Sequence, residues 1–180
     1  MRYHLRAARG ADLPALRHLI RESVSGLSTG FYSARQIESA LEFMFGPDSQ
    51  LIADGTYYVI EGEGAIVAAG GWSHRRTLFG GDQMKGSLPD PLLDPRTEPA
   101  RIRAFFVHPS SARRGLGRRL FEHCLASATE SGFRALELVA TLPGEPLYAS
   151  LGFAVVERFD VELPDGERLP VARMRRESGE

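Results

Sequence analysis

The sequence predicts a single α/β (α+β) domain, in which a mixed central β-sheet of six to seven strands is flanked by helices on both faces. Short β-branched and aromatic runs alternate with amphipathic stretches that end at glycine or proline, as the strands and helices of one such sheet would. The chain has 180 residues, a length that one hydrophobic core can serve. We therefore expect one domain over residues 1–180.

The chain is expected to begin with an edge strand and two helices. Residues 3–7 alternate apolar and polar side chains, which is typical of an edge strand. Asp12 is placed to cap a helix whose apolar residues recur every three or four positions. Ser33 and Gln36 have the spacing of a capping box, and the helix they open is expected to stop at the Gly-Pro pair 46–47.

A hairpin and a long loop follow. The apolar runs 56–61 and 65–72 are predicted to pair as strands, because Gly-Glu-Gly at 62–64 separates them. Residues 73–100 show no regular period and are rich in glycine and proline. Such a long loop is either functional or a disordered surface insertion, and the sequence leaves both interpretations open.

The rest of the chain predicts four more strands. They cover residues 101–107, 135–140, 153–162 and 169–175. A glycine- and arginine-rich bend after the first of them opens a helix that Gly132 closes. The second is apolar enough to lie at the centre of the sheet. A short helical turn over 146–152 precedes the third.

Composition and charge exclude several classes of function. The net charge is −1 at pH 7, so no overall field attracts nucleic acid or an anionic membrane. The N-terminus lacks a signal-peptide core, and no run of ~18 apolar residues could span a membrane. The single Cys124 allows no internal disulfide, and the histidines show no metal-ligand spacing. We expect a cytoplasmic protein that binds no metal, nucleic acid or membrane.

The most informative segment runs from Phe105 to Leu120, where a strand ends and a helix begins. Glycines let backbone approach a ligand, while the free N–H groups and the dipole of a helix start attract phosphate. Four arginines within seven residues add positive charge beside this start; they are Arg113, Arg114, Arg118 and Arg119. The segment therefore predicts a site for a polyphosphate.

Two known phosphate-binding loops fit this segment poorly. A nucleotide P-loop needs Lys-Ser or Lys-Thr after its last glycine, but two arginines follow Gly117. A dinucleotide fingerprint needs a third glycine where Leu120 stands, although Glu137 lies where a ribose-binding acid would be sought. A nucleotide-binding regulator is thus the weakest of the interpretations that the segment leaves open.

A third pattern fits better. The segment Ala-Arg-Arg-Gly-Leu-Gly at 112–117 resembles the acetyl-CoA site of the GNAT superfamily of N-acetyltransferases, and Leu-Tyr-Ala-Ser-Leu-Gly-Phe at 147–153 looks like a second motif of that family. Ala112 departs from the family's Arg or Gln, so Arg113 or Arg114 would have to supply the phosphate contact. Thr141 stands where the family often has a cofactor-binding asparagine, and a hydroxyl makes fewer hydrogen bonds than an amide.

The resemblance implies a fold, a cosubstrate and a general acid. The GNAT fold is expected, with acetyl-CoA as cosubstrate, and Tyr148 would protonate the leaving thiolate. The backbone N–H near Val107 would polarise the thioester carbonyl. The residues implied to bind the cofactor are Phe105, Phe106, Val107, Arg113, Arg114, Gly115, Leu116, Gly117, Arg118 and Thr141.

The base and the acceptor stay open at this point. A water chain or one of five side chains could deprotonate the acceptor amine; they are Glu61, Glu63, Glu137, His74 and His108. The acceptor, a primary amine of a small molecule or a peptide, would be recognised by the link 26–32 and the loop 73–100. The alternative to an enzyme is a non-catalytic acyl-CoA-binding regulatory module. Superfamily members often pair, so a homodimer is also considered.

Overall fold

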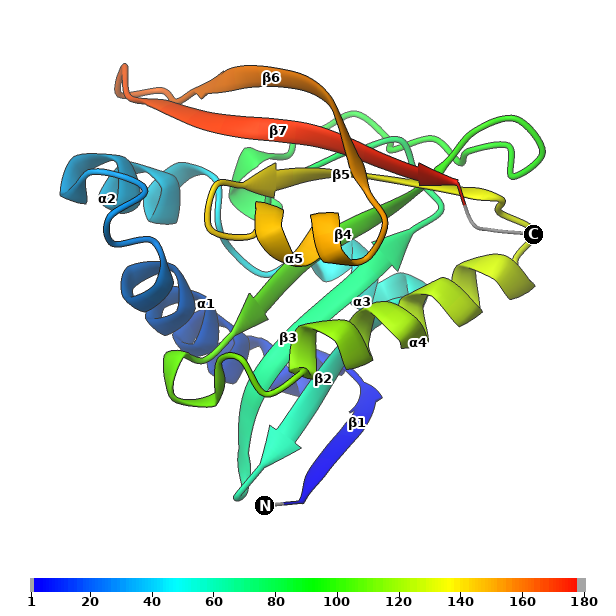
Figure 1. Ribbon diagram of the computed structural model, residues 1–180, viewed down its shortest axis with the longest axis horizontal. Helices are drawn as coiled ribbons and strands as arrows, with labels where there is room; N and C mark the ends of the chain where they lie inside the picture. The colour runs from blue at the N-terminus through cyan, green and yellow to red at the C-terminus, as the bar shows by residue number, and fades with distance from the viewer. Residues whose placement is uncertain (1, 178–180) are drawn as a thin grey trace.

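The computed structural model describes residues 2–177, which form one seven-stranded mixed sheet with helices packed on it (Figure 1). The strands are β1 (Tyr3–Ala7), β2 (Tyr57–Gly62), β3 (Ala65–Ser73), β4 (Ala100–Val107), β5 (Ala135–Thr141), β6 (Ala154–Glu162) and β7 (Arg168–Glu177). Their order in the sheet is β1-β2-β3-β4-β5-β7-β6. The central pair β4 and β5 is parallel, and the other neighbours are antiparallel.

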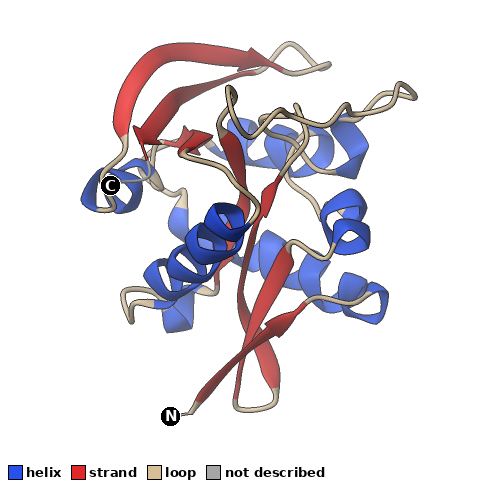
Figure 2. Cartoon of the chain, turned by 90° about the vertical axis from the view of Figure 1, so that its right-hand side faces the viewer, coloured by secondary structure: helices blue, strands red, loops and turns tan. Residues whose placement is uncertain are grey.

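Helices cover both faces of the sheet (Figure 2). They are α1 (Leu13–Leu27), α2 (Ala34–Phe43), α3 (Ser49–Asp54), α4 (Leu116–Glu130) and α5 (Glu145–Ser150). Alternate residues of β2 show the two layers, since successive side chains of a strand point to opposite faces. Tyr58 and Ile60 pack with residues of α4, whereas Tyr57 and Val59 pack with residues of α1 and α3. The predicted fold class, sheet and helix layers are confirmed.

The parallel strands β4 and β5 separate soon after they meet. They pair only at Ala100–Leu136 and Arg101–Glu137 within the described chain. Further along β4, Ala104 has a φ of 55°, in the left-handed region that residues other than glycine rarely adopt. The pairing of β4 with β3 shifts register beside it. The second half of β4, residues 105–107, therefore keeps β3 on one edge and has no strand on the other.

The strands lie within two residues of their predicted bounds, whereas some helix details differ. The six-residue α3 was not predicted; Asp48 caps it by accepting from two backbone N–H groups. α2 ends at Phe43, before the Gly-Pro pair, although the predicted Ser33–Gln36 capping box is present. Asp12 does precede α1, but its carboxylate does not cap that helix and instead accepts from Arg6 and from the Arg9 backbone.

The long loop 73–100 is packed against the core, so the interpretation as a disordered insertion is wrong. The Arg75 guanidinium binds Asp54 at 2.8 Å. The Leu93 side chain is buried, and its backbone N–H donates to the His74 carbonyl at 2.7 Å. Within the loop, the Thr77 N–H donates to Asp90 at 3.0 Å. These contacts hold the loop in a defined conformation.

A buried ion pair also holds the loop to the sheet. Arg103 of β4 is 3% exposed, and its guanidinium lies 2.8 Å from Asp48, which is fully buried. The same guanidinium donates to the backbone carbonyls of Thr77 and Gly80, at 3.1 and 2.7 Å. Lys85, from the same loop, forms a second ion pair with Asp48. Arg103 and Asp48 thereby join β4, α3 and the loop.

Candidate active site

The bend between β4 and α4 contains two glycines with different roles. Gly115 is the N-cap of α4 and has a left-handed backbone, with φ 79°. A Cβ there would meet no atom within 4 Å, so the conformation favours glycine while the space beside it stays open. At Gly117 a Cβ would come within 2.8 Å of the Leu147 side chain. Gly117 therefore lets α5 pack closely against the first turn of α4.

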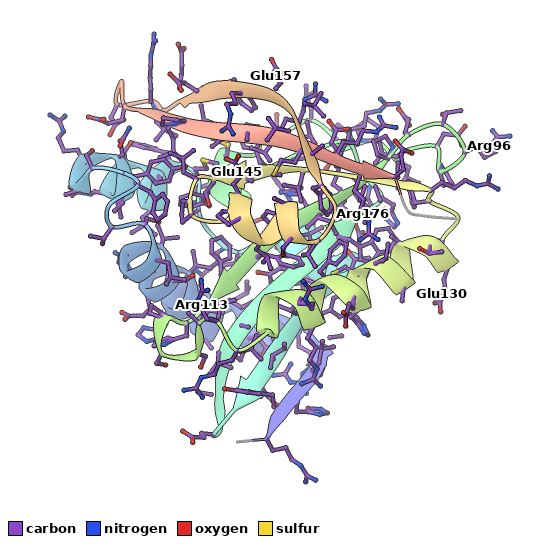
Figure 3. All side chains as sticks on the ribbon, viewed as in Figure 1. Arg96, Arg113, Glu130, Glu145, Glu157 and Arg176 are labelled. Atoms are coloured by element: carbon purple, nitrogen blue, oxygen red, sulfur yellow. The ribbon has the colours of Figure 1, made fainter. Side chains whose placement is uncertain are left out.

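The predicted phosphate-binding side chains surround this helix start. Arg113 lies in the loop that leads into α4 (Figure 3), and Arg113, Arg114 and Arg118 are all exposed. Arg114 donates to the Tyr3 hydroxyl at 3.2 Å. The first turn of α4 holds no acidic residue, so nothing there opposes the attraction of its dipole for an anion. The Leu116 side chain is buried in the core, which leaves only its backbone for a ligand.

Tyr148 of α5 lies beside the open half of β4. Its ring centroid is 6.1 Å from that of Phe105 and 6.0 Å from that of Phe153. Burial raises the pKa of its hydroxyl above the ordinary tyrosine value. Within residues 2–177 the hydroxyl makes no hydrogen bond, and the only fully buried polar side-chain atom without a partner there is Trp72 Nε1. The Tyr148 hydroxyl is thus protonated and has no hydrogen-bond partner within the described residues.

The backbone N–H of Val107 points to the open side of β4. The next residue, His108, donates its N–H to the Val67 carbonyl on the β3 side at 2.8 Å. Successive N–H groups of a strand point in opposite directions, so the Val107 N–H faces away from β3. There it donates to Ser23 Oγ of α1 at 3.2 Å. Ser23 is not among the predicted site residues, because it lies 84 positions from Val107 in the chain.

The other predicted binding residues lie near these groups. The Phe105 and Phe106 side chains pack on opposite faces of β4, one in each core. Thr141 is the last residue of β5, and its carbonyl accepts the Gly144 N–H at 3.1 Å, in the turn that leads into α5. The structure therefore brings the β4 end, the α4 start and α5 together around one site.

The candidate bases Glu137 and Glu61 both form ion pairs with arginine. Glu137 is 6% exposed and lies 2.6 Å from Arg173 and 3.3 Å from Arg101, so it joins neighbouring strands. Glu61 lies 2.8 Å from Arg6 at the sheet edge, and this hydrogen-bonded guanidinium lowers the pKa of its carboxyl. Both carboxylates therefore form ion pairs between strands of the sheet.

The other three candidate bases, His108, His74 and Glu63, differ in their contacts. His108 Nδ1 accepts from the Ser110 N–H at 3.2 Å and caps a short turn. His74 Nε2 lies 3.5 Å from Asp54 Oδ2, and the His74 ring packs edge-on against Trp72. Glu63 is exposed in the β2–β3 turn. None of these contacts identifies the base.

The described residues hold neither a metal cluster nor a membrane helix. Over residues 2–177 no three His, Cys, Asp or Glu side chains are grouped so that they could bind a metal ion. None of the helices in that part of the chain has the length and apolar content needed to cross a bilayer. Cys124 is buried, and burial raises the pKa of its thiol, so it is a core residue.

An open strand edge, a helix start suited to phosphate and a buried tyrosine beside that edge are the features expected of an acyl-CoA-dependent transferase. The chain belongs to the acetyltransferase (GNAT) family, whose model matches residues 17–153. That match spans the β4 end, the α4 start and α5. The acetyl donor of this family is acetyl-CoA, and the open space at Gly115 and the unpaired edge of β4 fit such a donor.

Solved structures share the fold over nearly the whole chain. A GCN5-related N-acetyltransferase from Rhodopseudomonas palustris is 19% identical with a TM-score of 0.71, over 98% of this chain and 96% of that one. The PaiA N-acetyltransferase from Thermoplasma acidophilum, in complex with coenzyme A, is 13% identical with a TM-score of 0.65, over 98% and 99%. The yncA acetyltransferase from Salmonella typhimurium, with its cofactor acetyl-CoA, is 18% identical with a TM-score of 0.63, over 100% and 96%. No curated protein matches the chain.

Replacing Gly115 with alanine should weaken coenzyme A binding about tenfold, measured by titration calorimetry. A left-handed alanine costs about 1–2 kcal/mol, so the bend would either hold this strain or turn its N–H groups away. Gly55, the C-cap of α3, is the matched control, because its φ of 75° and its open surroundings are nearly the same. Gly55→Ala should lose similar stability and keep its affinity for coenzyme A. Equal affinities in the two variants would contradict a binding role for Gly115.

Proposed function

We propose that the protein transfers the acetyl group of acetyl-CoA to a primary amine of a small molecule or a peptide. The observation that carries this proposal is the unpaired half of β4, where the Tyr148 ring lies 6.1 Å from that of Phe105 and from which the chain leads into α4. In the proposal, the main chain of residues 105–107 binds the pantetheine amides. The pyrophosphate is held by the bend 113–118, with Thr141 as a further polar contact.

The donor supplies an acetyl group activated as a thioester, and the chain supplies groups that position charge and protons. The Val107 N–H faces the open edge of β4, where a hydrogen-bond donor would stabilise negative charge on the acyl oxygen. Tyr148 keeps its proton because burial raises its pKa, and it can give that proton to the leaving sulfur. The acceptor amine must lose a proton, to solvent or to a base.

The acceptor is proposed to enter through a groove of about 440 Å³ between α1, α2 and the turn Asp82–Met84. Its inner wall approaches β4, because Phe45 in the groove packs edge-on against Phe106 with centroids 6.1 Å apart. Ile20, which also lines the groove, lies one helical turn before Ser23 on the buried side of α1. The groove thus leads from the surface toward the open end of β4.

Charges of both signs line this groove. Arg17 and Arg21 of α1 contribute positive charge, and Glu42 and Asp82 contribute negative charge. A carboxylate would attract a protonated amine, and an arginine would bind a carboxylate on the same acceptor. An acceptor that carries both an amine and a carboxylate, such as an amino acid or a short peptide, fits this lining better than a purely apolar amine.

A thiol-release assay with a panel of amines tests the proposal. Purified protein with acetyl-CoA should release free coenzyme A only when a suitable amine is present, and amines that also carry a carboxylate should give the highest kcat/KM. Titration calorimetry on the same protein measures binding of coenzyme A. Binding without turnover on the whole panel would favour the regulatory acyl-CoA-binding module. Absence of binding at millimolar coenzyme A would contradict both.

A further inference from the structure

The hydroxyl of Ser23 is buried at the open edge of β4 with its proton unused. Ser23 lies on α1 and is 5% exposed, and its Oγ accepts the Val107 N–H at 3.2 Å. A serine within a helix can donate its hydroxyl proton to the backbone carbonyl one turn earlier. Within residues 2–177 the Ser23 hydroxyl donates no hydrogen bond. Buried donors in proteins almost always have an acceptor, so this one is available to a ligand.

Close packing fixes the position of this hydroxyl. One turn after Ser23, α1 passes so near the end of β4 that a Cβ on Gly26 would lie 2.4 Å from Pro109 Cγ. Pro109 begins the short turn that follows His108. The contacts at Gly26 and at Val107 thus hold the helix against the strand at two neighbouring points. The fold therefore places Ser23 beside the end of β4, and the hydrogen bond from the Val107 N–H orients its hydroxyl oxygen.

We infer that Ser23 is a catalytic residue that donates its hydroxyl proton in a hydrogen bond to the acyl carbonyl oxygen. This inference rests on the proposed function. The Val107 N–H donates to Ser23 Oγ and so polarises the hydroxyl, which makes it a stronger donor to a carbonyl beyond it. As negative charge grows on the acyl oxygen this hydrogen bond strengthens, and Ser23 keeps its proton throughout. The amide thereby acts on the acyl group through the serine.

A purely structural role for Ser23 predicts the opposite effects. In that case the hydroxyl only satisfies the Val107 N–H until the donor arrives, and it must move aside for the acyl oxygen. Removing it would then remove a competitor, so acetyl-CoA would bind more tightly and turnover would stay the same or rise. The sign of the change therefore distinguishes the two roles.

The first test compares three variants in the thiol-release assay. Ser23→Ala should lower kcat by about 10²-fold, as the loss of one oxyanion donor does. Ser23→Thr keeps the hydroxyl and should recover most of the rate. Ser25→Ala is the matched control, because Ser25 is exposed on the same helix and should leave kcat unchanged. An unchanged or higher kcat in Ser23→Ala would overturn the inference.

The second test needs no turnover. Isotope-edited infrared spectra of acetyl-CoA bound without acceptor should show the thioester carbonyl stretch at higher frequency in Ser23→Ala than in the wild type. By calorimetry, Ser23→Ala should lose affinity for acetyl-CoA several-fold and keep its affinity for coenzyme A, which lacks the carbonyl. Identical spectra would overturn the role of Ser23. A wild-type protein that binds coenzyme A without turnover would contradict the proposed function instead.

Discussion

Replacing Tyr148 with phenylalanine should lower kcat by roughly 10–10³-fold with little change in the KM for acetyl-CoA. The ring packs between Phe105 and Phe153 and would remain there in the variant, so the site should keep its shape. What is lost is a hydroxyl beside the open half of β4 that has no hydrogen-bond partner within residues 2–177. The leaving thiolate would then take its proton from solvent. Steady-state kinetics at saturating acetyl-CoA measure the effect.

The control for this prediction is Tyr58→Phe, which also removes a hydroxyl from the same core cluster but at a contact with Ser127 of α4. Tyr58→Phe should leave kcat unchanged. Because burial raises the pKa of Tyr148, the hydroxyl should stay protonated up to about pH 10, so no alkaline loss of kcat below that pH is expected from it. A Tyr148→Phe enzyme as fast as the wild type would remove Tyr148 from the mechanism.

Replacing Asp48 with asparagine should lower the free energy of unfolding by about 3–5 kcal/mol. The substitution keeps an oxygen that can cap α3 but leaves the buried Arg103 guanidinium without its counter-ion. Burial already lowers the pKa of Arg103, and the Asp48 charge opposes that shift. Urea denaturation followed by fluorescence or circular dichroism measures the loss.

The matched control is Asp94→Asn, which breaks an exposed ion pair with Arg96 in the same loop. Exposed pairs contribute little, so this variant should unfold close to the wild-type midpoint. Since Asp48 and Arg103 also hold the loop 73–100, Asp48→Asn should in addition make that loop more sensitive to proteolysis. A loss of stability no larger than that of Asp94→Asn would show that the buried pair is not essential.

Local signals in the sequence predicted most of the fold. Strand bounds followed from alternating or continuous apolar runs, and the Ser33–Gln36 box marks the observed start of α2. α3 was not predicted, because its six residues are too few to show a helical period of apolar side chains. Asp12 was misjudged because its carboxylate binds Arg6 on a neighbouring strand, a contact made by the folded chain.

The site was predictable where it is local and unpredictable where distant segments meet. The bend 113–118 and Tyr148 are recognisable as sequence motifs. The close packing of Gly117 against Leu147, by contrast, cannot be predicted from the sequence. The contact between Ser23 and Val107 joins residues 84 positions apart, and that between Asp48 and Arg103 joins residues 55 apart. No local pattern in the sequence predicts such contacts, because they depend on how the helices pack on the sheet.

The short contact between β4 and β5 has a consequence for how the molecule responds to its donor. With only two residue pairs between them, the segments β1–β4 and β5–β7 share few main-chain hydrogen bonds at the centre of the sheet. A pantetheine chain lying along the unpaired edge of β4 would supply hydrogen-bond partners to main-chain groups that no neighbouring strand pairs. Adding coenzyme A should therefore slow deuterium uptake most strongly at the amides of residues 105–107, and raise the melting temperature.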